Sequence, residues 1–338
     1  MFAMKARRRG WIARAAALAV VAAALVFLAA APAAADGSGL IFVSNEKSST
    51  ISILDGKTNT VIRSIKTCAR PRGMHFSKDR KLFYVGCADD DLIAVYDTAT
   101  ARLVDRIRNI EEPETFDLHP DGSLLYVSNE EDATASVVDL ATRKVIHTVD
   151  LGEEPEGVLF TSDGATVYVA SEAANLVHVI DTASGEIRAD ILVDTRPRRF
   201  ALTPDERELW VSAELAGMVD IIDTRTNKII ADIAFLPRGL RKEEVTPVDV
   251  LITRDGKTAF IALGRANHVA VVDVASRKVE TYILVGKRPW GLALTRDEKT
   301  LYVANGLSDD LSIIDVASRR VLKSVPVGMV PYGILIDD

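Results

Sequence analysis

The sequence contains few of the residues that most often carry redox or metal chemistry. It has two cysteines, five histidines and three tryptophans among 338 residues. No Cys-x-x-Cys pair and no Cys-x-x-Cys-His segment is present, which excludes a thioredoxin-like motif and covalent c-type haem attachment. Zinc-ligand spacing is also missing among the histidines, which are His75, His119, His147, His178 and His268. We therefore expect no metal site and no resident cofactor.

Other signatures of catalysis are missing too. The sequence has no Gly-x-Ser-x-Gly nucleophile elbow and no glycine-rich phosphate loop. The chain's formal charge is −7, and five of its basic residues lie in the first 35, so the remainder carries −12. An acidic surface repels the phosphate backbone of nucleic acids. These absences exclude a nucleic-acid partner and favour a binding protein over an enzyme.

The sequence does contain a repeat. Residues 155–191 form four short apolar segments separated by turns, and near-copies of this unit fill most of the chain. Three anchors recur at a step of 42 residues, with one step of 50. An aromatic residue lies in the second segment, at Phe42, Tyr84, Tyr126, Tyr168, Trp210, Phe260 and Tyr302. An aspartate closes the third, at Asp55, Asp97, Asp139, Asp181, Asp223, Asp273 and Asp315. A proline opens the first, at Pro71, Pro113, Pro155, Pro197, Pro247, Pro289 and Pro331.

Seven copies of this unit predict the fold. Four strands repeating every ~40–45 residues are typical of a β-propeller blade. We predict an all-β, seven-bladed β-propeller with four-stranded antiparallel blades. The chain enters at a second strand (40–43) and leaves at a first strand (331–336). We expect the C-terminal strand to join the N-terminal blade and close the ring, because this pairing removes both open strand edges.

The first 35 residues have the pattern of a secretory signal peptide. Lys5 and the arginines at 7–9 precede an Ala-rich apolar run, and three alanines precede Asp36. We expect cleavage, export to the periplasm and no stable membrane span afterwards; an uncleaved membrane anchor is the alternative. Residues 36–338 are predicted to form one domain with an eight-residue insertion at about 235–244. We expect the protein to be a monomer.

The two cysteines suggest a crosslink. Exported proteins fold in an oxidising environment that favours disulfides. Cys68 precedes a predicted first strand and Cys87 ends the following second strand, so both lie toward the same face of one sheet. A Cys68–Cys87 disulfide is predicted, and two buried free thiols are the alternative.

The most variable positions flank the recurrent proline. They lie where the innermost strands begin, at one mouth of the central channel, and a concave mouth with convergent polar groups is typical of a binding site. The alternative is a solvated rim whose charges pair with one another. A deeper pair, Arg199 and Asp249, is expected to form an ion pair between neighbouring blades. The candidate ligand- or partner-binding residues are Arg70, Arg72, Glu112, Glu114, Glu154, Glu156, Arg196, Arg198, Arg288, Trp290 and Tyr332.

Short motifs within the repeats resemble a known family. The segments FVSN (42–45), YVSN (126–129), YVAS (168–171) and YVAN (302–305) precede strands that end in aspartate, and P-x-G segments recur. They resemble YVTN-type β-propeller repeats over residues 40–336. The seven-repeat layout with a signal peptide is similar to propeller proteins associated with pyrroloquinoline quinone (PQQ)-dependent alcohol catabolism. This resemblance implies an accessory protein of that catabolism and its transport system, without implying that the chain binds the quinone.

Three functions remain open at this point. The favoured one is an exported, non-catalytic binding or scaffold protein that holds a periplasmic protein partner or a small ligand. The second is a lactonase-like hydrolase, which would need a carboxylate and asparagine metal cluster at the channel. The third is the large subunit of an amine-dehydrogenase-like complex whose cofactor lies on another chain. A propeller fold cannot separate these functions.

Overall fold

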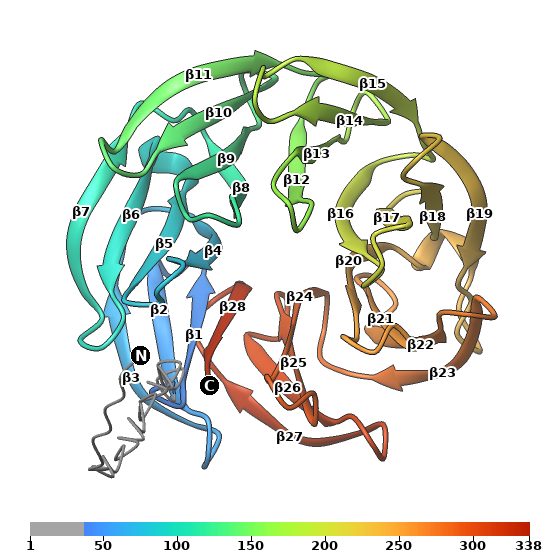
Figure 1. Ribbon diagram of the computed structural model, residues 1–338. Helices are drawn as coiled ribbons and strands as arrows, with labels where there is room; N and C mark the ends of the chain where they lie inside the picture. Colours follow the sequence, from blue (N-terminus) through green and yellow to red (C-terminus); the bar gives the residue numbers. More distant parts are fainter. Residues whose placement is uncertain (1–36) are drawn as a thin grey trace, which may run out of the picture. The chain divides into compact units, whose positions relative to one another are not determined.

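A computed structural model describes residues 37–338, and the predicted signal peptide lies outside the described residues. Twenty-eight strands form seven four-stranded antiparallel sheets, arranged as blades around an axis (Figure 1). This arrangement confirms the predicted seven-bladed β-propeller. Within residues 37–338, no helix has the length and apolarity needed to span a membrane.

Each blade is numbered here by its place in the ring, and its strands are given from the first, innermost strand outward. Blade 1 consists of β28 (Pro331–Asp337), β1 (Leu40–Asn45), β2 (Thr50–Asp55) and β3 (Thr60–Lys66). Blade 2 consists of β4 (Pro71–Phe76), β5 (Leu82–Cys87), β6 (Leu92–Asp97) and β7 (Arg102–Arg108), with a 3-10 turn, η1 (Ala88–Asp90). Blade 3 consists of β8 (Pro113–Leu118), β9 (Leu124–Asn129), β10 (Thr134–Asp139) and β11 (Lys144–Asp150). Blade 4 consists of β12 (Pro155–Phe160), β13 (Thr166–Ser171), β14 (Leu176–Asp181) and β15 (Ile187–Leu192).

The remaining blades follow the same order. Blade 5 consists of β16 (Pro197–Leu202), β17 (Glu208–Ala213), β18 (Met218–Asp223) and β19 (Lys228–Ala234). Blade 6 consists of β20 (Pro247–Ile252), β21 (Thr258–Leu263), β22 (His268–Asp273) and β23 (Lys278–Leu284). Blade 7 consists of β24 (Pro289–Leu294), β25 (Thr300–Asn305), β26 (Asp310–Asp315) and β27 (Arg320–Pro326).

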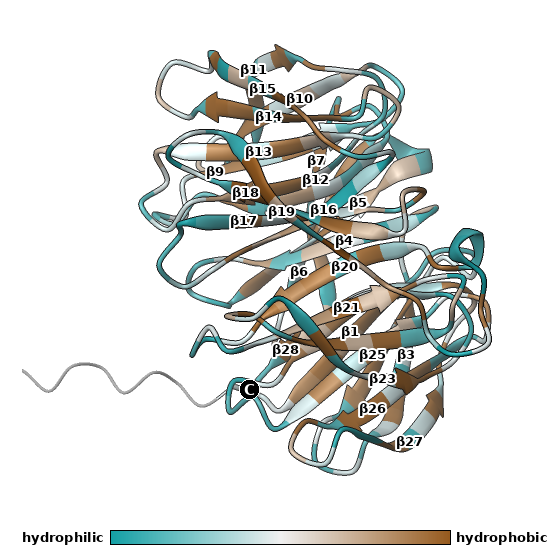
Figure 2. Ribbon diagram, turned by 90° about the vertical axis from the view of Figure 1, so that its right-hand side faces the viewer, coloured by the Kyte–Doolittle hydropathy of each residue, from teal (hydrophilic) through white to brown (hydrophobic). Residues whose placement is uncertain are grey.

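The middle strands of each blade are apolar on both faces because neighbouring blades cover both. In β13, with the sequence TVYVAS, every residue after the first is buried. The outermost strand β15 is mostly exposed. Figure 2 shows hydrophobic residues concentrated on the strands and hydrophilic residues on many of the loops. In one interface, Tyr168 and Ala170 of β13 pack against Phe200 and Val211 of blade 5. Burying a large apolar side chain contributes roughly 1.5–3 kcal/mol.

Aspartates fix the turns on one face of the ring. The aspartate that ends each third strand accepts a hydrogen bond from the backbone N–H three residues later; Asp181 accepts the Ser184 amide at 2.7 Å. This aspartate turn occurs in all seven blades, at Asp55, Asp97, Asp139, Asp181, Asp223, Asp273 and Asp315. In blade 4 the turn ends at Gly185, whose φ of 73° lies in the left-handed region that glycine adopts easily.

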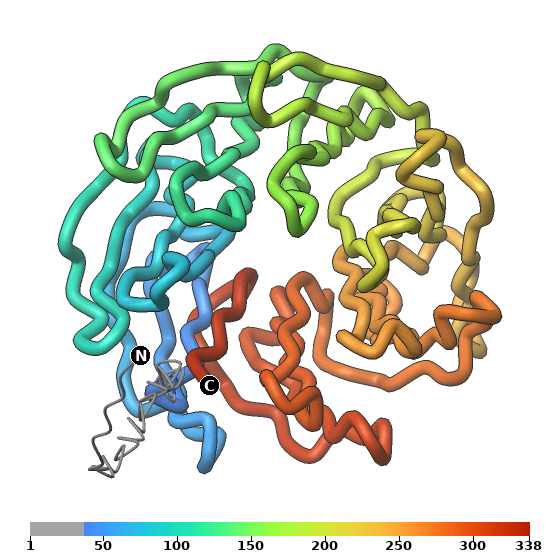
Figure 3. The backbone as a smooth tube through the Cα atoms, viewed as in Figure 1, coloured from blue at the N-terminus to red at the C-terminus, as the bar shows by residue number. Residues whose placement is uncertain are grey.

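The two ends of the described chain meet in blade 1. β28 pairs with β1 in antiparallel register, with Ile336 opposite Ile41 and Leu335 opposite Phe42. The Asp337 carboxylate also accepts hydrogen bonds from the Ser38 amide and hydroxyl, at 2.9 and 2.7 Å. Figure 3 shows the blue start and the red end of the ring side by side. The predicted closure is therefore confirmed.

The insertion lies between β19 and β20 and ends in a 3-10 turn, η2 (Lys242–Glu244). Phe235 at its start and Val245 after it are buried in one hydrophobic cluster. The amide of Leu236 donates to the Tyr282 hydroxyl at 2.9 Å, while the Leu236 side chain is exposed. The loop is thus anchored at both ends.

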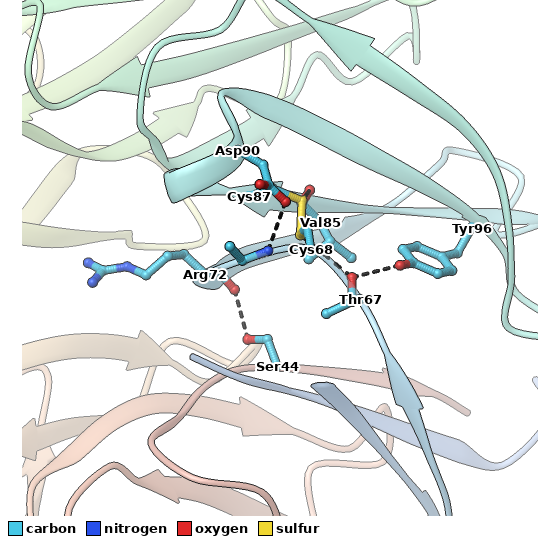
Figure 4. Close-up of a disulfide and its surroundings, with 9 residues drawn as sticks. Ser44, Thr67, Cys68, Arg72, Val85, Cys87, Asp90 and Tyr96 are labelled. Atoms are coloured by element: carbon cyan, nitrogen blue, oxygen red, sulfur yellow. Dashed lines mark hydrogen bonds between the residues drawn. A yellow bond between two sulfur atoms is a disulfide. The ribbon is translucent and has the colours of Figure 1, made fainter. Parts of the chain in front are cut away.

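Cys68 and Cys87 are joined by a disulfide with a Cα–Cα distance of 5.6 Å. The bond connects the loop before β4 to the end of β5, next to Thr67 and Asp90 (Figure 4). The Asp90 carboxylate accepts the Ala69 amide at 2.9 Å, which holds the same loop from the other side.

The disulfide occupies a place where other blades use a hydrogen bond. The loop that enters a blade donates an amide to a side chain on the second or third strand of that blade. In blades 1, 4, 5 and 7 the acceptors are Asn45, His178, Asp220 and Ser312, at 2.8–3.3 Å. We call these contacts the loop tethers. In blade 2 the Cys68–Cys87 disulfide takes the place of this hydrogen bond.

Replacing both cysteines in Cys68→Ser/Cys87→Ser should lower the free energy of unfolding by about 3 kcal/mol, because the disulfide closes a short loop in the unfolded chain. Urea unfolding followed by circular dichroism measures the difference. A reducing agent should destabilise the natural protein by a similar amount and leave the variant unchanged. Equal stability of the two proteins under oxidising conditions would contradict the prediction.

Candidate functional site: the charged mouth of the ring

The first strands begin, and the second strands end, on one face of the ring, which we call the proline face. The residue before the proline has a positive φ in six blades, at Arg70, Glu112, Glu154, Arg196, Arg288 and Val330. This left-handed residue turns the chain from the loop into the innermost strand. The ends of the second strands bring Glu46, Glu130, Glu172 and Glu214 to the same face.

Arg70 lies at the centre of an acidic group. Its guanidinium contacts Glu112 and lies 2.8 Å from Glu114, 3.4 Å from Glu46 and 3.7 Å from Glu130. Ligand atoms of Glu112, Glu114 and Glu130 lie within 4.8 Å of one another, and carboxylates suit a hard cation. Because Arg70 contacts all three, its positive charge compensates this group in part.

Tyr332 connects the two halves of the mouth. Its hydroxyl donates to Glu156 at 2.7 Å and accepts hydrogen bonds from Arg72 at 3.1 Å and from Arg199 at 2.7 Å. The guanidinium of Arg72 also lies 4.2 Å from the Tyr332 ring centroid and contacts Glu114. Since these side chains come from blades 1, 2, 3, 4 and 5, they fix the innermost strands relative to one another.

Arg198 holds three carboxylates together. It lies 3.1 Å from Glu156, 2.6 Å from Glu172 and 3.3 Å from Glu214, and is only 4% exposed. Its guanidinium also lies 4.9 Å from the centroid of Trp290. Buried ions of this kind need close partners, because each loses its hydration.

Two further arginines complete the mouth near its rim. Arg196 lies 2.6 Å from Glu172, 3.2 Å from Glu214 and 3.8 Å from Glu154. Arg288 lies 2.7 Å from Glu214. Glu214 therefore interacts with three arginines, including Arg198, and cannot neutralise them all.

All eleven predicted site residues lie in one continuous network of contacts. The structure buries much of it, including Arg72, Glu114, Glu156, Arg198 and Tyr332, more deeply than a solvated rim would. Their role in binding stays a prediction. Sequence reasoning missed Arg199 as a member of this network, although its charge next to Arg198 was visible.

The expected ion pair between Arg199 and Asp249 is wrong. Arg199 turns to Tyr332 and Glu156, and no ion pair within 4.0 Å joins it to Asp249 among residues 37–338. Asp249 instead accepts the backbone amides of Leu292 and Val250, at 2.8 and 3.0 Å. The carboxylate thus connects neighbouring first strands through the backbone.

Burial and ion pairing shift the pKa values of two acidic residues at the mouth in opposite directions. Burial opposes the charged form of Glu156, but Arg198 and Arg72 outweigh it, and the pKa of Glu156 falls to about 2. For Glu172 burial dominates, helped by repulsion from Glu156 and Glu214, and its pKa rises to about 8. The two neighbouring carboxyls thus prefer opposite protonation states near neutral pH.

A second polar group resembles a hydrolase triad. Ser171 Oγ lies 2.9 Å from His178 Nε2, and His178 Nδ1 lies 2.6 Å from Asp190. Ser171 has no exposed surface, and the Gly152 amide donates to His178 Nε2 at 3.1 Å. Because the same position holds loop tethers in other blades, we assign this group a structural role.

Comparisons with known proteins agree with the fold. The choice-of-anchor I domain profile matches residues 128–300, just over half of the chain, and the YNCE-like beta-propeller profile matches residues 6–129. No curated protein matches the sequence.

Several solved structures share the architecture at low sequence identity. Periplasmic gluconolactonase PpgL from Pseudomonas aeruginosa is 20% identical, with a TM-score of 0.75 over 88% of this chain and 99% of that one. A functionally unknown protein from Desulfotomaculum acetoxidans is 17% identical, with a TM-score of 0.76 and coverage of 88% and 99%. Hydrazine synthase from Kuenenia stuttgartiensis is 22% identical, with a TM-score of 0.70 and coverage of 78% and 88%. At these identities the similarity shows the fold alone.

Arg198→Met should destabilise the protein by about 3–5 kcal/mol, because it leaves the buried carboxyl groups of Glu156, Glu172 and Glu214 without their shared partner. The matched control is Arg254→Met, which removes an exposed arginine paired with Glu298 and should cost less than about 1 kcal/mol. Urea unfolding of both variants measures the difference. Similar losses for the two variants would show that Arg198 does not hold the mouth together.

The free energy of unfolding should also depend on pH, through the protonation of Glu172. The pKa of Glu172 is raised in the folded state, so its contribution is complete below about pH 4.5 and is lost as pH rises toward about 8. Unfolding free energy should therefore fall across this window by up to about 1.4 kcal/mol per pH unit. Glu172→Gln should flatten that fall, measured by urea unfolding at several pH values, with Glu153→Gln at the exposed rim as control. An unchanged slope in Glu172→Gln would contradict the assignment.

Proposed function

We propose that this chain, a β-propeller that belongs to the choice-of-anchor I domain family, is an exported, non-catalytic binding protein that captures a partner at its proline face. The partner is a periplasmic protein or a small ligand, and the mouth network forms the rigid base of the site. The chain acts as a monomer in this proposal.

The observation that carries the proposal is the contrast between the two faces. The face opposite the mouth repeats the same aspartate turn in all seven blades. The proline face differs in charge and size from blade to blade, and it bears the insertion that follows Phe235. Because a single site cannot be sevenfold, the variable face is the place for recognition.

Exposed charge on that face favours attraction of a partner. The exposed acids on the loops of blades 2–4 that make no ion pair within 4.0 Å in the described part of the chain include Glu111, Glu131, Asp132 and Glu153. Free charges of one sign raise association rates with an oppositely charged partner. This acidic sector suits a basic protein surface.

The support for export and for an accessory role comes mainly from the sequence. The signal-peptide pattern of residues 1–35 supports export, and the Cys68–Cys87 disulfide suits an oxidising compartment. The seven-repeat layout supports an accessory role in PQQ-dependent alcohol catabolism and its transport system. In this role another protein carries the cofactor.

Lactone hydrolysis is the second candidate, because Glu112, Glu114 and Glu130 form a carboxylate group of suitable spacing for a cation. In this structure Arg70 contacts all three, so a cation would have to displace its guanidinium. Metal analysis of the purified protein separates the two functions. One divalent ion per chain, lost in Glu114→Gln, would favour the hydrolase.

Crosslinking in the exporting cell tests the binding face. A photoactivatable amino acid at Glu131 or Leu215, both exposed on the proline face, should give crosslinked partner adducts. The same amino acid at Glu186 or Lys257 on the opposite face should give none. Adducts only from the opposite face would overturn the proposal.

A further inference from the structure

A hollow between blades 6 and 7 opens on the proline face, beside the mouth network. It measures about 420 Å³ and is lined by Arg265, Asn267, Lys287, Arg288 and Leu307. Three of these five residues are cationic, and the hollow has no carboxylate in its lining. It lies in the part of the ring away from the acidic sector of blades 2–4.

The positive charge of this hollow is poorly compensated. Arg265 and Lys287 are exposed, and neither makes an ion pair within 4.0 Å among residues 37–338. Arg288 is mostly buried and contacts one carboxylate, Glu214, which also contacts Arg196 and Arg198. Burial lowers the pKa of Arg288; contact with Glu214 offsets part of this effect, and the nearby charges of Arg198 and Arg265 lower the pKa as well.

Hydrogen bonds hold the backbone that carries these cations. The Asn267 side chain accepts the Arg288 amide at 2.9 Å, and the Ser308 hydroxyl accepts the Lys287 amide at 2.8 Å. The Thr246 hydroxyl accepts the Arg265 amide at 2.8 Å. Recognition of a small ligand requires groups that are already in place, because ordering them on binding weakens affinity.

The pairing of a basic residue at the Arg265 position with a basic residue at the Lys287 position occurs once among the seven blade junctions of the described ring. At the position of Arg265 the other blades carry Lys47, Asp89, Glu131, Ala173, Leu215 and Leu307. At the position of Lys287 they carry Ala69, Glu111, Glu153, Thr195, Val245 and Met329. Only the hollow between blades 6 and 7 has a basic residue at both positions, so the cluster is not part of the repeated scaffold.

Apolar surface lies next to the cations. Leu307 is 67% exposed at the wall of the hollow. The Arg288 guanidinium lies 4.4 Å from the centroid of the Trp290 ring, and this contact orients the polar edge of the guanidinium. A ligand here would place an oxyanion on the cations and a short carbon chain against Leu307.

We propose that this hollow binds a small organic oxyanion, a carboxylate or a phosphate ester with a short carbon portion. Guanidinium and ammonium groups are the usual partners of both oxyanions in proteins. This inference deepens the proposed function, since it rests on the proline face being the binding face, and it gives that face a ligand of defined charge in addition to a protein partner.

Isothermal titration calorimetry with succinate and with inorganic phosphate tests whether the hollow binds an oxyanion. At least one probe should bind with a dissociation constant below about 1 mM, and the stronger one identifies the oxyanion. Succinamide, which has the same carbon chain without charge, should not bind. Arg265→Gln/Lys287→Gln should weaken binding at least about tenfold, since charged hydrogen bonds are lost.

The matched control is Arg254→Gln/Lys257→Gln, which removes the same two charges from the opposite face and should leave binding unchanged. Circular dichroism confirms that both variants fold. Binding of neither probe, or equal weakening in the two variants, would overturn this inference. The crosslinking experiment tests the protein partner separately from the oxyanion site. Adducts at Glu131 without anion binding would contradict only the oxyanion site. Anion binding without adducts would contradict only the protein partner.

Discussion

Face-to-face packing of neighbouring blades is the constraint on which the whole structure depends. The second and third strands of each blade are apolar on both sides, so each blade needs two neighbours to cover it. An open row of blades would expose two apolar sheets and unpaired strand edges. A closed ring of seven covers every blade, and the radial arrangement then forces seven innermost strands to begin around one axis.

The charged mouth follows from this geometry. Some of the side chains that flank the prolines, such as Arg72, Glu114 and Glu156, are buried together in the network. Their charges therefore compensate one another through shared partners, as Glu156 does with Arg72, Arg198 and the Tyr332 hydroxyl. Such a network is rigid, because removing one member leaves others buried without a partner. A rigid base suits recognition by the exposed loops above it.

The sequence predicts much of the fold, because the fold is a repeat. Anchors such as Tyr168, Asp181 and Pro155 recur at a step of 42 residues, with one step of 50, and this spacing predicts strand order, blade number and closure. The cysteine pair was predictable too, since both positions can be placed on one sheet. Side-chain partners across the axis were not, because their contacts depend on distances between blades. Arg199 shows this limit, as it reaches Tyr332 of blade 1 instead of Asp249 of the neighbouring blade.

The loop tethers show a similar limit. Asn45, His178, Asp220 and Ser312 share no chemistry that a sequence pattern would group, yet each accepts an amide from the entering loop. The common requirement is a tether between loop and blade, and several side chains meet it. Only the structure separates His178 in this role from a catalytic histidine.

The seam in blade 1 has a consequence for how the molecule is made. Because synthesis runs from the N-terminus, β1 is made long before β28, and blade 1 lacks its inner strand until β28 has emerged from the ribosome. Six blades can form earlier, but the ring stays open until that final strand arrives. The ring can therefore close only after β28 has paired with β1, whatever the order in which the other six blades form.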